Sequence, residues 1–73
     1  MKTVYTAIIE REDNMYVALC PELDIASQGA TIEEAKGNLT EAVELFLETA
    51  DDSEVLQRTH FEPYVTRFEV SVG

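Results

Sequence analysis

The stretch from Gln28 to Ala35 constrains the fold most, because it marks the start of a helix. Thr31 is a favoured N-cap residue and Glu34 follows it by three positions, which is the pattern of a capping box. We expect Thr31 Oγ to accept a hydrogen bond from the Glu34 N–H, and the Glu34 carboxylate to accept one from the Thr31 N–H. The sequence therefore predicts a helix from Thr31 to about Thr49.

The residues after Thr31 repeat with helical periodicity. Apolar side chains recur at steps of three and four and form a stripe roughly 140° wide, which must be buried. The stripe consists of Ile32, Ala35, Leu39, Ala42, Val43, Phe46, Leu47 and Ala50. Five glutamates lie on the opposite side, namely Glu33, Glu34, Glu41, Glu44 and Glu48. Leu45 is the one large apolar residue among them.

The length of the chain limits how stable a monomer can be. Its 73 residues, 45% of them apolar, predict one folded domain spanning residues 1–73. The core of so small a domain supplies only a few kcal/mol of net stability. We therefore expect a homo-oligomer, either a dimer or a tetramer.

The charge of the chain bears on its partners. Fifteen acidic residues against five basic ones give a formal charge of -10, whereas binding to phosphates requires lysines and arginines. We expect no direct contact with nucleic acid and favour a basic protein partner. The sequence shows no secretory signal and no apolar run long enough to cross a bilayer, and its single cysteine excludes an internal disulfide. These features predict a cytoplasmic protein without membrane contact.

Alternating apolar and β-branched residues predict four strands, which are Thr3–Glu10, Met15–Cys20, Leu23–Gln28 and Tyr64–Val72. The charged run from Arg11 to Asn14 is expected to form a hairpin turn, in which Asn14 is able to adopt positive φ. A polar break should follow Ala50, then one helical turn at Val55–Arg58 and a linker at His60–Pro63. The order β-β-β-α-β predicts an α+β fold of two layers. Three antiparallel strands and a crossover fourth strand would form the sheet, with one helix packed on it.

The sequence lacks the residue sets that common active sites require. Cys20 precedes Pro21 and is expected to be a small buried residue, and His60 a solvated loop residue, so a cysteine nucleophile has no base beside it. Asp24 is the one acid within a strand pattern, and we expect it in a turn or at an edge. We therefore predict no catalytic residues, no bound metal and no cofactor.

Three linked motifs resemble the HicB-like antitoxin family. They are Tyr16-Val17-Ala18 with Pro21 and Leu23, the run from Ser27 to Ala35, and Asn38-Leu39 with Glu41-Ala42. The resemblance covers about Tyr5 to Glu48 and points to the short, single-domain members of UPF0150 type. It implies a reduced form of the ribonuclease H fold. Longer members carry a C-terminal DNA-binding module, and this chain ends at Gly73 without one, so the resemblance does not extend to direct autoregulation of transcription.

The resemblance implies a function that agrees with the acidic charge. It suggests an antitoxin-like inhibitor that binds a small basic, messenger-cleaving toxin of the HicA kind. The alternative is a stand-alone oligomeric domain that binds a small ligand or acts as an enzyme. The candidate partner-binding residues are Glu41, Glu44, Leu45 and Glu48 on the helix, and Glu10, Glu12 and Asp13 at the hairpin.

Overall fold

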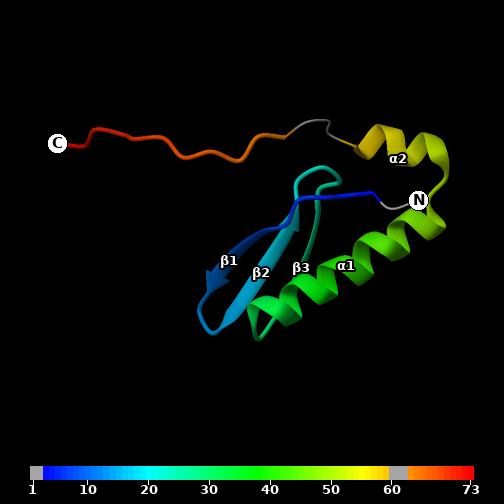
Figure 1. The fold of residues 1–73 in the computed structure, drawn as a ribbon, viewed down its shortest axis with the longest axis horizontal. Coiled ribbons are helices and arrows are strands. Elements are labelled where there is room, and N and C mark those ends of the chain that lie inside the picture. The colour runs from blue at the N-terminus through cyan, green and yellow to red at the C-terminus, as the bar shows by residue number, and fades with distance from the viewer. Residues whose placement is uncertain (1–2, 60–62) are drawn as a thin grey trace.

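The structure is a computed structural model that describes residues 3–59 and 63–73. Its elements are β1 (Ile8–Glu12), β2 (Met15–Cys20), β3 (Ile25–Gly29), α1 (Ile32–Thr49) and α2 (Asp52–Arg58). Strands β1 to β3 form one layer and α1 lies against it as the second layer (Figure 1). The predicted α+β class with three antiparallel strands and one long helix on the sheet is confirmed.

The sheet has the order β1-β2-β3, and both neighbouring pairs are antiparallel. Strand β1 continues to Glu12, which pairs with Met15, so the turn contains only Asp13 and Asn14. The positive φ of this turn, 53°, is at Asp13 and not at Asn14, the residue that the sequence offered for it. The shorter turn places the left-handed position one residue earlier, where aspartate also tolerates it.

The core lies between α1 and the face of the sheet that carries Ala18 and Cys20. Its buried residues are Ala18, Cys20, Leu23, Ala35, Leu39 and Val43. Helix α1 packs mainly on β3, less on β2 and least on β1. Gly29 permits the close approach to β3, because a Cβ at that position would lie 2.5 Å from the backbone nitrogen of Ala35.

The start of α1 follows the sequence pattern. Thr31 is the N-cap in extended conformation, and its Oγ1 accepts a hydrogen bond of 3.0 Å from the Glu34 N–H. The reciprocal bond, from the Thr31 N–H to the Glu34 carboxylate, is not formed between these two described residues. One half of the capping box therefore stabilises the helix, which ends at Thr49 as predicted.

Helix α2 is longer than the single turn that we expected. It begins at Asp52 because Asp51 is itself an N-cap, accepting a hydrogen bond of 2.8 Å from the Glu54 N–H. At the other end, the Arg58 guanidinium donates to the carbonyls of Leu23 and Asp24, and it lies 5.1 Å from the centre of the Phe46 ring. These contacts attach α2 to the β2–β3 turn and to the end of α1.

The first and third strands are displaced from their predicted positions. Residues Thr3–Ala7 are not part of the sheet, because the β1–β2 register would bring Thr6 opposite Pro21, which has no N–H to donate. The third strand begins at Ile25 rather than Leu23. Asp24 lies in the preceding turn with φ 56°, which confirms its expected turn role.

The predicted crossover of a fourth strand onto the sheet is not seen in the described residues. No strand is assigned in the C-terminal segment, residues 63–73, which extends away from the sheet in Figure 1. Tyr64 is 89% exposed, Phe68 85% and Val72 91%. A strand requires a partner for its backbone groups, and in this structure the segment does not reach one. Most of the predicted linker, His60 included, lies outside the described residues.

Candidate functional site

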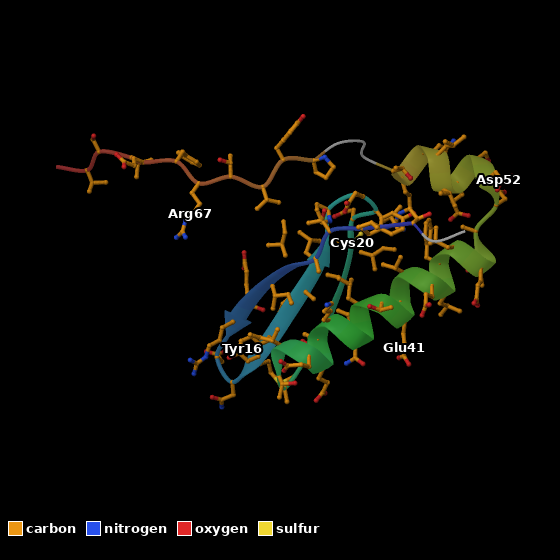
Figure 2. All side chains as sticks on the ribbon, in the orientation of Figure 1. Tyr16, Cys20, Glu41, Asp52 and Arg67 are labelled. Atoms are coloured by element: carbon orange, nitrogen blue, oxygen red, sulfur yellow. The ribbon has the colours of Figure 1, made fainter. Side chains whose placement is uncertain are left out.

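The acidic residues of α1 form the first candidate surface. Glu41, Glu44 and Glu48 are exposed and lie about one helical turn apart, with Leu45 between them at 61% exposure. Figure 2 shows Glu41 directed away from the sheet. We call these four residues the helix surface. The structure brings them together on one side of α1, as the sequence periodicity predicted.

The charges of the helix surface are unfavourable for the helix itself. Glu44 and Glu48 are four residues apart, a spacing at which like charges repel. Glu48 also lies in the last turn, near the negative end of the helix dipole, and no basic residue is present in that turn. Lys36 is the single base of α1 and lies two turns away from Glu44. The fold thus carries a local electrostatic cost at this surface.

The acidic residues of the hairpin form a second, separate surface. Glu10, Glu12 and Asp13 are exposed, and we call them the hairpin surface. Ile9 packs against the core beneath α1, so Glu10 and Glu12, which alternate with it, point to the opposite face of the sheet. The seven predicted partner-binding residues therefore occupy two layers of the molecule, and they do not form one concave site.

An open groove lies between α1 and the chain preceding β1, and sequence reasoning missed it. Its volume is about 520 Å³. The lining side chains are Thr3, Tyr5, Thr6 and Ala7 on one wall, Cys20 at the base, and Lys36, Leu39, Thr40, Val43, Glu44 and Leu47 on α1. The groove exists because α1 is shifted toward β3. The apolar stripe of α1 could have indicated this groove. The stripe includes Leu47, and a single helix on three strands leaves part of it uncovered.

Cys20 and Glu22 connect the base of this groove to its N-terminal wall. The Thr6 N–H donates a bifurcated hydrogen bond to both oxygens of the Glu22 carboxylate, at 2.9 and 3.1 Å, and the Cys20 thiol donates one of 3.5 Å. Burial raises the pKa of Cys20, so the thiol stays protonated, in agreement with its predicted buried role. Burial opposes ionisation of Glu22, but the hydrogen bonds outweigh it and lower the pKa of this carboxyl.

Two further properties concern the described part of the chain, residues 3–59 and 63–73. No cluster of three or more histidine, cysteine, aspartate or glutamate side chains in it is placed to hold a metal ion. Neither helix in these ranges combines the length and apolar character that a membrane crossing requires.

Comparison with known proteins gives several relatives. Two UPF0150 proteins of Synechocystis sp. are 51% and 52% identical to the chain, over 47 and 50 residues. The alignments cover 62% and 66% of this chain, and 60% and 69% of the relatives. A UPF0150 protein of Thermotoga maritima is 38% identical over 60 residues, which is 78% of this chain and 80% of the relative. No family model matches the chain. No solved structure matches it either.

Proposed function

We propose, from the premise that the chain belongs to the UPF0150 family, that it is an acidic protein-binding module whose helix surface binds a basic protein. The finer proposal is an antitoxin-like inhibitor of a small, basic, messenger-cleaving toxin of the HicA kind. The three motifs that resemble HicB-like antitoxins support this partner class. Two of those motifs continue into α1, the helix that carries the proposed surface.

The observation that carries the proposal is the unfavourable charge arrangement at the end of α1. A helix that needs only a soluble outer face is served equally well by lysines, which would also stabilise the last turn through the helix dipole. Here Glu44 and Glu48 repel each other, and Glu48 faces the negative end of the dipole. A bound cationic partner would relieve both costs, whereas folding alone gives no reason for them.

Leu45 gives this surface an apolar centre. It is 61% exposed and is flanked along the helix by Glu41 and Glu48. An apolar residue surrounded by charged ones has the layout of a protein contact, in which the centre is dehydrated and the rim remains polar. The acidic rim would steer a basic partner and exclude RNA from the same basic patch, which is how binding would inhibit a messenger-cleaving toxin.

The test compares two variants with the same change in net charge. The first, Glu41→Gln with Glu44→Gln and Glu48→Gln, neutralises the helix surface. The second, Glu10→Gln with Glu12→Gln and Asp13→Asn, neutralises the hairpin surface, and asparagine tolerates the positive φ at position 13. Each variant is titrated against a purified HicA-like toxin while association rate and messenger cleavage are measured at low and high salt.

The helix variant should associate more slowly, lose much of its salt dependence and fail to block messenger cleavage. Its melting temperature should hold or rise, because repulsion within α1 is relieved. The hairpin variant should associate only slightly more slowly than the parent, because it loses net charge but keeps the helix surface. Equal effects of the two variants would mean that the total charge acts and no surface is specific. An unchanged helix variant would place the contact elsewhere.

A further inference from the structure

The strongest unexplained feature of the molecule is the C-terminal segment. Its apolar side chains alternate along the chain, so that Tyr64, Phe68, Val70 and Val72 share one parity and are each at least 71% exposed. The opposite parity carries Val65, Arg67, Glu69 and Ser71, so three of its four residues are polar. This is the pattern of a strand with one face against a core and the other in water. The segment is extended, yet it covers none of the described core.

The sheet has a free position that matches such a strand. Among the described residues, β1 pairs with β2 on one side and with no strand on the other. The groove adjoins the start of this edge, between residues 3–7 and α1, and its helix wall presents Val43 and the partly exposed Leu47. A strand added at the β1 edge would place one face under this wall. Its backbone would form hydrogen bonds with the unpaired N–H and C=O groups of the β1 edge.

The dimensions and charges also agree. Residues 64–72 span about 30 Å as a strand, whereas β1 (Ile8–Glu12) spans about 17 Å, so the segment would pair with β1 and continue alongside residues 3–7. The segment has one basic and one acidic residue, Arg67 and Glu69, so it is neutral in a chain of net charge -10. Contact through the segment therefore avoids placing the glutamates of two helix surfaces against each other. An association through Leu45 on α1 would bring them together.

The shape of the chain shows that the C-terminal segment is not packed on its own sheet. The Cα radius of gyration is 14.3 Å, whereas a compact domain of this length has about 11 Å. Figure 1 shows why, since the C-terminal segment runs outward past the other elements and leaves the edge of its own sheet empty. Figure 2 places Arg67 out on this segment, apart from the labelled residues of the sheet and helices.

We propose that two copies of this chain exchange their C-terminal segments. Residues 64–72 of each copy add to the β1 edge of the other, and Phe68 and Val70 cover the groove beside Leu47. The exchange is symmetric and closed, because each copy gives one strand and receives one. The proposal concerns self-association and goes beyond the proposed function. Glu41, Leu45 and Glu48 of the helix surface do not line the groove and stay free for a basic partner on both copies, whereas Glu44 is shared by the groove and the helix surface.

The first experiment measures mass by light scattering over a range of micromolar concentrations. The parent chain should have twice its monomer mass of 8.2 kDa. Phe68→Asp with Val70→Asp should give the 8.2 kDa species, because charges would enter the groove. Val65→Asp with Ser71→Asp adds the same charge on the opposite parity and should remain a dimer. Added salt should strengthen the parent dimer by screening repulsion between two acidic copies.

The second experiment establishes that the contact is made between copies. One copy carries Leu47→Cys on the groove wall, another carries Phe68→Cys or Val70→Cys, and the two are mixed under mild oxidation. A disulfide between the copies should form with Leu47→Cys and not with the control Leu45→Cys on the helix surface. Cys20 can remain, because it is 1% exposed.

Three results would overturn the proposal. A parent chain that keeps a mass of 8.2 kDa at every concentration would exclude the exchange between copies. Hydrogen exchange would then show whether residues 64–72 pair with their own sheet, and are protected, or remain unpaired and unprotected. Equal loss of the dimer in both aspartate variants would show that charge and not the apolar face decides. Trapping through Leu45→Cys in place of Leu47→Cys would indicate pairing of the helix surfaces.

Discussion

Helix α1 and the C-terminal segment have equally clear amphipathic patterns but different surroundings. On α1, Ala35, Leu39 and Val43 are all less than 9% exposed, whereas Phe68 on the segment is 85% exposed. The helix follows directly on β3, with Ala30 and Thr31 as the only residues between them, so the chain itself supplies the surface that covers the stripe. The segment has no such neighbour. Periodicity therefore specifies the conformation of an element, and topology decides what the element packs against.

The source of the backbone hydrogen bonds sharpens this comparison. A helix satisfies its N–H and C=O groups internally, and Thr31 closes one of the open donors at its start. A strand satisfies none of these groups without a second strand. Local sequence can thus complete α1, while the C-terminal segment depends on an edge that is provided elsewhere.

The largest expected difference between the two regions comes from truncating a side chain in each. Leu39→Ala leaves a cavity beneath α1 and should lower the free energy of unfolding by about 2–5 kcal/mol. Phe68→Ala should change it by less than about 0.5 kcal/mol, measured by urea unfolding at a dilution where the chain is monomeric. A comparable loss in both variants would mean that the C-terminal segment packs on its own core.

The sequence predicted the parts of the fold that local interactions determine. The cap at Thr31, the end of α1 at Thr49 and strand β2 were all confirmed. The predicted crossover of residues 64–72 onto the chain's own sheet is not seen, because the pattern was clear but its partner was assumed. The start of α2 was missed because Asp51 was interpreted as part of a polar break, although Glu54 three residues later completes a capping pattern.

The candidate site shows the same division. Helical periodicity correctly placed Glu41, Glu44, Leu45 and Glu48 together. It could not show that the hairpin acids lie on the other layer, because that depends on which parity of β1 faces α1. The groove was not predictable either. It arises from the sideways position of α1, which is set by the contact between Gly29 and the first turn of α1.

The next largest effect is expected from substitutions at two glycines, one at the contact between β3 and α1 and one without close neighbours. Gly29→Ala would place a Cβ 2.5 Å from the Ala35 nitrogen, and because the clash is with backbone, the helix must move. We expect a loss of about 1–3 kcal/mol. Gly37→Ala meets no atom within 4 Å and should stabilise α1 by about 0.5–1 kcal/mol. Thermal unfolding of both variants measures the difference, and effects of the same sign would contradict it.

A smaller effect is expected at the cap of α1. Thr31→Ala removes the acceptor for the Glu34 N–H and should cost about 1 kcal/mol, or several degrees in melting temperature. Thr31→Ser retains the hydroxyl and is the matched control. If both variants had the melting temperature of the parent, the N-cap would not contribute to the stability of α1.

The smallest effect concerns Glu22, which attaches residues 3–7 to the sheet through the Thr6 N–H. Hydrogen bonds lower the pKa of Glu22 in the folded chain, so the unfolded chain binds more protons in the acidic range. The stabilisation is therefore complete above the unfolded pKa of about 4.3 and is lost as the pH falls through the lower folded value. Glu22→Gln should be less stable than the parent near neutral pH, and the gap should close on acidification. A gap that is constant with pH would mean that the charge of Glu22 does not hold this wall of the groove.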